Sequence, residues 1–200
     1  MAENLSAINL FYLYRKLLFP YCNITVRLRC EATGKLKQGD RLVVVPVRHA
    51  LNLLNFHGRL GTLAEVLDVQ EKEGQCHLQM KGLSRVRIRR RNGLRRGKAE
   101  VIEESAQPDC GRLREDLRKR SQELIFLINV EESDKLIHLL NFIVNIHQLT
   151  DFIANYFVVK FPARLKLYRE LDVVKRASSL LDIMEGLIDN LKKRAGKEVS

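Results

Sequence analysis

Residues 61–88 read GTLAEVLDVQEKEGQCHLQMKGLSRVRI, and this stretch decides the fold. Apolar and polar residues alternate on both sides of a polar turn at residues 71–74. The alternation resumes after Gly82 and continues to Ile88. A period of two on either side of a glycine-containing break predicts a β-hairpin followed by a further strand.

The neighbouring segments also predict strands. Residues 24–30 alternate between apolar and polar side chains, as in a half-buried strand. Residues 42–47 form a continuous apolar run rich in β-branched side chains, which favours a central strand. Residues 99–102 close the set, and Pro20 ends an apolar segment near the N-terminus. Several short strands separated by turns indicate a barrel or a sandwich.

The sequence changes character at residues 105–111, where Pro108 and Gly111 indicate a linker. We therefore expect a β-rich subdomain over 1–107 and a helical subdomain over 108–200. In the first helix, one face should carry Leu113, Leu117, Leu124 and Ile128. Residues 134–144 are apolar on nearly every side, so this short helix is expected to be buried.

The helix ends carry capping signals. Asn145 is suited to cap a helix over 147–157, and Pro162 suits the first turn of the next helix. Asp172 can cap the last helix. That helix repeats apolar residues at spacings of four and three, which predicts a long amphipathic helix packed on the others.

Basic residues concentrate in one segment of this chain, whose formal net charge is +11. The candidate basic patch within residues 81–98 comprises Arg85, Arg87, Arg89, Arg90, Arg91, Arg95 and Arg96. The first three alternate with Val86 and Ile88, as the outward face of a strand does. We favour a solvated strand face over a site for phosphates or acidic polypeptides. The segment holds no aromatic residue that could stack on a base.

The motifs of common enzyme classes are absent from the sequence. It contains no GxxxxGK[ST] phosphate loop, no GxSxG and no HExxH. The five histidines share no ligand spacing, and the four cysteines form no CxxC pair, so neither a metal nor another cofactor is predicted. No apolar run is long enough to cross a bilayer, and we expect a cytoplasmic protein that does not bind membranes.

Residues 49–58, HALNLLNFHG, follow the central strand and concentrate apolar side chains. The commoner outcome is that these side chains pack into the core. The alternative is an exposed apolar patch that captures peptides, with Leu53, Leu54 and Phe56 as the candidate binding residues.

Several stretches are similar in kind and order to those of one known family. They are LFYLYRKLLFP at 10–20, GTLAEV at 61–66, GLSRVRI at 82–88, LTDFIA at 149–154 and the leucine-rich segment from 171 to 191. In these the chain resembles the N-terminal, substrate-binding domain of Lon proteases. It departs from the family pattern at Tyr12, which stands where proline is usual, and at Tyr21, which stands where glycine is usual.

The resemblance implies an α+β fold with a six-stranded, PUA-like pseudo-barrel followed by a helical bundle. It also implies a non-catalytic module that recognises unfolded or tagged polypeptides and can self-associate. The ATPase and Ser-Lys peptidase domains of a full Lon protease have no counterpart here. We therefore expect either a stand-alone homologue or a fragment whose parent would be an ATP-dependent serine protease. RNA binding through the basic segment at 81–98 is the alternative, because PUA-like barrels often bind RNA.

Overall fold

The computed structural model describes residues 3–29, 36–49, 58–104, 110–128 and 133–198. The chain divides into two compact units, Met1–Glu103 and Glu104–Ser200. We call them the barrel unit and the helical unit.

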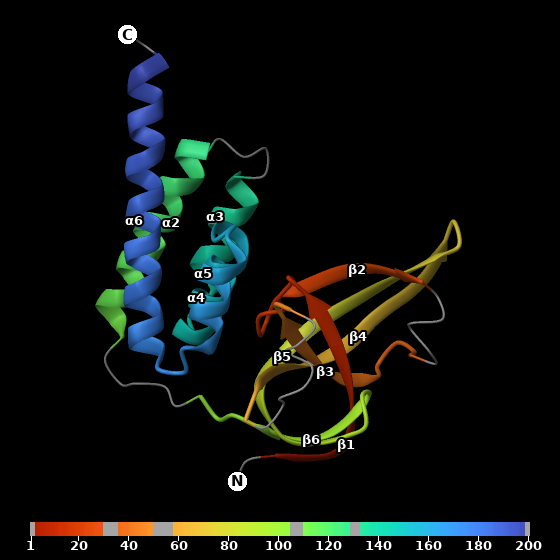
Figure 1. Cartoon of the computed structure of the whole chain (residues 1–200). Helices are drawn as coiled ribbons and strands as arrows, with labels where there is room; N and C mark the ends of the chain where they lie inside the picture. The colour runs from red at the N-terminus through yellow and green to blue at the C-terminus, as the bar shows by residue number, and fades with distance from the viewer. Residues whose placement is uncertain (1–2, 30–35, 50–57, 105–109, 129–132, 199–200) are drawn as a thin grey trace. The chain divides into compact units, whose positions relative to one another are not determined.

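The barrel unit contains one six-stranded sheet, as predicted (Figure 1). Its strands are β1 (Asn4–Tyr14), β2 (Asn23–Arg29), β3 (Arg41–Val47), β4 (Leu60–Lys72), β5 (Gln75–Asn92) and β6 (Arg96–Val101). The strand order is β2-β5-β4-β3-β1-β6, and β6 also pairs with β5, which closes the sheet on itself. The β1–β3 pair is parallel and the other pairs are antiparallel.

The predicted hairpin is the β4–β5 pair, which turns at Glu73 and Gly74. Both residues have positive φ, 53° and 72°, as the tight turns of β-hairpins require. The expected further strand is instead the continuation of β5. The register of β5 against β4 shifts between Leu63 and Ala64, so a β-bulge lies where a break was predicted.

The central strand is β3, in agreement with its continuous apolar sequence. Leu42 and Val44 belong to one apolar cluster, whereas Val43 and Val45 belong to another. Successive side chains of a strand point to opposite faces, so both faces of β3 are buried. This double burial explains why its sequence does not alternate.

Gly82 lies where the N-terminal segment crosses β5. Its amide donates to the carbonyl of Cys22, and its carbonyl accepts from the amide of Tyr21, both at 2.8 Å. A Cβ at this position would overlap the carbonyl oxygen of Phe19. Only glycine therefore lets the Phe19–Pro20 turn approach the bulge this closely.

The helical unit follows the predicted order of helices (Figure 1). Within its described residues the helices are α2 (Gly111–Ile128), α3 (Ser133–Phe142), α4 (Ile146–Phe157), α5 (Phe161–Arg169) and α6 (Val173–Glu198). The Asn145 side chain accepts from the first amides of α4, and Pro162 lies in the first turn of α5. Asp172 accepts from the amides of Val174 and Lys175 at the start of α6. The three capping predictions are thus confirmed.

The prediction that the short helix over 134–144 is buried was wrong. Leu140 is the buried residue of α3, whereas Leu139 and Phe142 are exposed. The reason is that α3 packs along α2 and leaves its opposite side uncovered. At the end of α2, Ile128 is also exposed, although Leu117 and Leu124 of the same face are buried. No helix in the described ranges is both long and apolar enough to span a bilayer.

Candidate functional site

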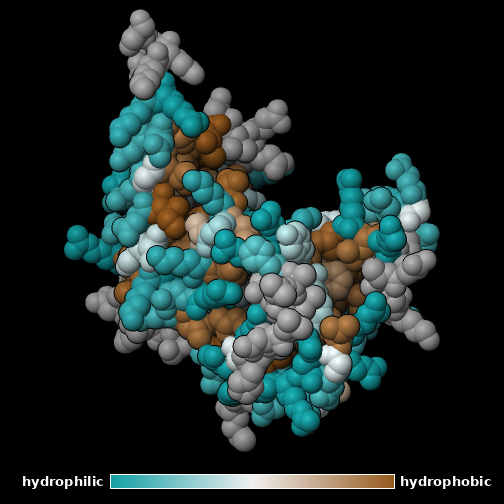
Figure 2. All heavy atoms as spheres, in the orientation of Figure 1, coloured by the Kyte–Doolittle hydropathy of each residue, from teal (hydrophilic) through white to brown (hydrophobic). Residues whose placement is uncertain are grey.

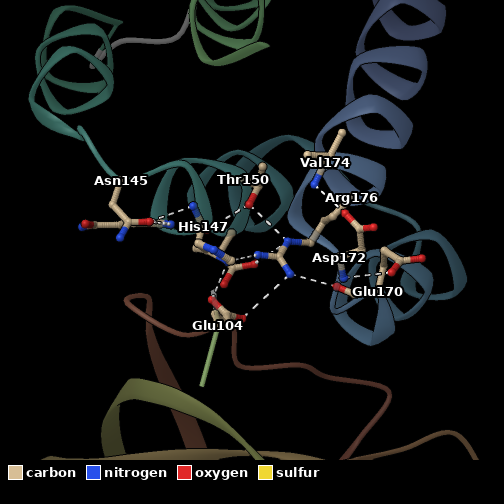
Figure 3. Close-up of polar contacts among 10 residues, drawn as sticks. Glu104, Asn145, His147, Thr150, Glu170, Asp172, Val174 and Arg176 are labelled. Carbon is tan, nitrogen blue, oxygen red and sulfur yellow. Dashed lines mark hydrogen bonds and ion pairs between the residues drawn. The ribbon is translucent and has the colours of Figure 1, made fainter. Parts of the chain in front are cut away.

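The helical unit encloses charged side chains that we call the buried charge network: Glu104, His147, Asp151 and Arg176. Figure 3 shows Glu104, His147 and Arg176 of this network. The guanidinium of Arg176, on α6, is fully buried. It lies 3.7 Å from the Asp151 carboxylate and 3.8 Å from that of Glu104. Glu104 in turn lies 2.8 Å from Nδ1 of His147, in the first turn of α4. The network therefore ties the first residue of the helical unit to α4 and α6.

Arg176 also organises neutral groups around it (Figure 3). Its Nε donates to the Thr150 hydroxyl at 3.2 Å, and its Nη1 donates to the carbonyl of Glu170 at 2.8 Å. The Thr150 hydroxyl donates in turn to the carbonyl of His147. That hydroxyl is thus committed to the backbone, and these groups do not form a nucleophile–base pair. A buried arginine held by several acceptors is typical of a structural network.

The His147 ring has two competing partners. Its Nδ1 lies 2.8 Å from the Glu104 carboxylate and 3.1 Å from Nη2 of Arg176. A neutral imidazole nitrogen either donates or accepts, so Nδ1 can hydrogen-bond with only one of these groups at a time. Among the described residues, no group of three or more His, Cys, Asp or Glu side chains is arranged to hold a metal ion.

Arg85 is fully buried, although its sequence position predicted an outward-facing side chain. It lies opposite Thr62 in the β4–β5 ladder, and Thr62 is also buried. The Thr62 hydroxyl donates to the carbonyl of Leu18 at 2.6 Å, so the N-terminal segment covers this face of the sheet. Val86 is buried on the other face. Both faces of β5 are covered here, and Arg85 does not belong to the exposed patch.

The remaining arginines of the predicted patch reach the surface to different extents. Arg87 and Arg91 are half-buried, whereas Arg89, Arg90, Arg95 and Arg96 are exposed. Arg89 forms an ion pair with Glu100 at 2.5 Å. Burial raises the pKa of the Tyr12 hydroxyl, and the neighbouring charge and hydrogen bond of Arg91 lower it in part.

The candidate peptide-binding residues Leu53, Leu54 and Phe56 lie outside the described residues. Their assignment stays a prediction from the sequence.

The helical unit carries an exposed apolar surface that the sequence reading did not single out. Among the described residues, eleven large apolar side chains are exposed, and six of these lie within residues 126–144. They define what we call the α2–α3 apolar surface: Phe126, Leu127, Ile128, Leu139, Phe142 and Val144. Phe126 and Phe142 are 69% and 68% exposed, which is unusual for side chains of this size. Figure 2 shows apolar atoms at the surface of the α2 and α3 region.

The contacts between α2 and α3 show that the two helices that carry these side chains lie side by side. The Arg118 guanidinium donates to the carbonyls of Leu140 and Ile143, and Gln122 donates to Asn141. Polar contacts therefore hold α3 along α2. Phe126 lies one turn beyond Gln122, on the same side of α2. The interhelical bonds leave Phe142 on the outer side of α3.

One signal in the sequence points to the buried charge network. Arg176 lies three residues after Val173 and four before Leu180, both of which belong to the buried stripe of α6. Helical spacing therefore places Arg176 on the buried face, where an arginine needs partners. Its partners Glu104 and His147 are distant in sequence and give no local signal.

Comparison with known proteins gives a consistent result. The family model described as the ATP-dependent protease La (LON) substrate-binding domain matches residues 7–186. The N-terminal domain of Lon protease from Mycobacterium avium complex has a similar structure, with a TM-score of 0.69 at 15% identity, over 90% of this chain and 98% of that chain. The Lon N-terminal domain protein from Xanthomonas campestris has a TM-score of 0.57 at 20% identity, over 89% of this chain and 98% of that chain. A search of curated proteins gave no match.

Proposed function

This chain belongs to the ATP-dependent protease La (LON) substrate-binding domain family, and from that premise we propose that it binds unfolded or tagged polypeptides without catalysing a reaction. Family membership supports a substrate-binding module. The nature of the bound substrate and the surface that binds it are our proposal.

The observation that carries the proposal is the α2–α3 apolar surface. Soluble proteins rarely expose several large apolar side chains together unless a partner covers them. Aromatic side chains contribute much of the free energy of binding at protein interfaces, so Phe126 and Phe142 are the expected anchors. Unfolded polypeptides expose leucine and phenylalanine side chains that a folded protein buries, and these can pack on such anchors.

Leu53, Leu54 and Phe56 are proposed as a second apolar contact. The supporting observation is the density of apolar residues in the segment HALNLLNFHG. Two separate contacts on one polypeptide would increase its affinity through a raised effective concentration.

The test measures binding of an uncharged, fluorescein-labelled peptide composed of Leu, Phe, Ser and Gly by fluorescence anisotropy. We expect saturable binding by the wild type and a loss of at least about thirtyfold for Phe126→Ser combined with Phe142→Ser, because each of the two anchors contributes roughly 1 kcal/mol or more. Phe56→Ala should weaken binding by a smaller factor.

Val159→Ser is the matched control, because Val159 is also exposed and lies between α4 and α5, outside the α2–α3 apolar surface. Circular dichroism verifies that each variant is folded. An absence of saturable binding by the wild type, or equal affinities of the double variant and the control, contradicts the proposal. Sedimentation analysis of the wild type shows whether a second copy of the chain covers the surface instead.

A cytoplasmic location is also proposed. Cys22, Cys76 and Cys110 are free thiols, as is usual in reducing compartments. Cell fractionation tests this, and recovery of the protein in an extracytoplasmic fraction contradicts it.

A further inference from the structure

The hairpin formed by β5 and β6 presents a face with an unusual charge arrangement. In this ladder Ile88 lies opposite Ala99, and Arg90 lies opposite Lys98. Ile88 and Ala99 are buried, whereas Arg90 and Lys98 are exposed. Because strand side chains alternate between faces, the exposed side chains of this hairpin lie together on the face opposite Ile88 and Ala99. We call this set the cationic face; it comprises Arg87, Arg89, Arg90, Arg96, Lys98 and Glu100.

A β-bulge increases the charge density of this face. The register shifts between Ile88 and Arg90, so Arg89 is an extra residue, and both Arg89 and Arg90 are exposed. Gly97 accommodates the bulge, since a Cβ there would lie 2.9 Å from the Arg90 carbonyl oxygen and 3.1 Å from Cδ1 of Leu10. The glycine thus permits two consecutive arginines to reach the same surface.

The charges on this face are not balanced within the hairpin. Glu100 is the only acidic residue in residues 84–101, and it pairs with Arg89. Arg90 and Lys98 are directly opposed on neighbouring strands, an arrangement that destabilises a sheet. Arg96 lies two residues from Lys98 and therefore on the same face.

In the helical unit, by contrast, several cations pair with neighbouring carboxylates. Arg118 pairs with Glu115, and Arg120 and Lys192 both pair with Glu123. These three cations of the helical unit lie beside carboxylates, whereas the hairpin sets Arg90 against Lys98. A ligand that supplies carboxylates would relieve this repulsion.

We propose that the cationic face binds an extended, acidic segment of the polypeptide substrate. This inference rests on the proposed function and specifies the class of substrate. Along an extended strand, every second side chain is separated by roughly 7 Å, and this matches the spacing of Arg96 and Lys98 along β6. Carboxylates on alternate residues of a substrate therefore face these two cations. A polypeptide is favoured over a nucleic acid because residues 84–101 contain no Phe, Tyr, Trp or His on which bases could stack.

The experiment compares a fluorescein-labelled peptide of alternating Glu and Ser with the same peptide carrying Gln in place of every Glu. We expect the acidic peptide to bind at least about fivefold more tightly to the wild type at low salt, with the difference reduced at high salt. Combining Arg90→Gln with Lys98→Gln should abolish most of this preference.

The control variant combines Arg112→Gln with Lys119→Gln, which removes the same charge from exposed positions on α2. Equal binding of the two peptides by the wild type overturns the proposal, and so does an equal loss in both double variants, since that reports net charge alone. A single-stranded RNA of equal charge that binds more tightly than the acidic peptide, and depends on Arg90 and Lys98, overturns it in favour of a nucleic-acid ligand.

The two peptides distinguish a failure of this proposal from a failure of the proposed function. If only the cationic face fails, the uncharged Leu- and Phe-containing peptide still binds the wild type, and it binds the Arg90→Gln, Lys98→Gln variant equally well. If only the α2–α3 apolar surface fails, that peptide does not bind, while the acidic peptide keeps its preference.

Discussion

In the barrel unit, two close contacts between backbone segments depend on glycines. In the helical unit, by contrast, buried ionisable side chains connect the helices. Gly82 lets the Phe19–Pro20 turn reach β5, and Gly97 lets β6 approach a bulge. In the helical unit, Arg176 bridges Glu104 and Asp151 inside the helical bundle. Strands pair through their backbones, and a glycine, which has no Cβ, lets another backbone segment approach a strand closely. Helices satisfy their own backbones, and specific contacts between them must come from side chains.

This difference predicts which substitutions damage each unit. The barrel unit should be sensitive to added volume at its glycines. The helical unit should be sensitive to the loss of charge from its buried network. The largest expected effect comes from that network.

Replacing Arg176 by methionine removes the guanidinium that Asp151 and Glu104 face. Breaking a buried ion pair from one side typically costs about 3–5 kcal/mol, because the remaining charge stays buried. Hydrogen exchange measured by mass spectrometry should show lost protection in α4 and α6, with the barrel strands unchanged. Arg194→Met, at an exposed position on α6, is the control and should leave protection intact.

Gly82→Ala tests the opposite side of the comparison. The added methyl group overlaps the Phe19 carbonyl oxygen, and overpacking of this kind costs about 1–3 kcal/mol or more. Hydrogen exchange should show the loss in the barrel unit alone.

The same substitution at Gly186 should have the reverse sign. Gly186 lies within α6, where a Cβ meets no neighbouring atom. Alanine there should stabilise the helical unit by up to about 1 kcal/mol. If Gly82→Ala is as stable as the wild type, the close approach at Gly82 does not specify the fold.

Substitutions of charged residues on the surfaces of the two units should change stability less than the buried substitutions do. Lys98→Gln removes the like-charge opposition with Arg90 and should stabilise the barrel unit by about 0.2–1 kcal/mol. Glu100→Gln should act in the opposite sense, because it removes the carboxylate that pairs with Arg89. Thermal unfolding at low salt compares the two variants, and a destabilised Lys98→Gln would contradict the charge argument.

The smallest expected effect is on the surface of the helical unit. Hydrogen bonds from Lys192 and Arg120 hold the pKa of the Glu123 carboxyl below its ordinary value. A depressed folded-state pKa means that this contribution to stability is present at neutral pH and is lost as the pH falls through that pKa. An NMR titration should find a higher Glu123 pKa in Lys192→Met. An unchanged pKa would show that the pair does not form.

Local sequence patterns predicted most of the barrel unit, because the order of apolar and polar residues within a strand indicates which of its faces are buried. Residues 42–47 indicated a central strand, and β3 is one. Arg85 was misplaced because the segment that covers it, near Leu18, is distant in the sequence. Periodicity within a strand cannot reveal such a cover.

The helical unit was predicted less completely for the same physical reason. Asn145 and Asp172 were recognised as caps because capping involves neighbouring residues. The apolar residues of α3 were expected inside, but Phe142 is exposed, because composition does not say how many neighbours a helix has. Contacts such as that between Glu104 and His147 depend on packing between distant segments.

The position of β1 in the sheet has a consequence for how the chain is made. β1 pairs with β3 on one side and with β6 on the other. The ribosome releases β1 before either neighbour, and the last of them ends at Val101. One edge of the nascent β1 therefore stays open until β6 has been synthesised, and this edge is where chaperones should engage during translation.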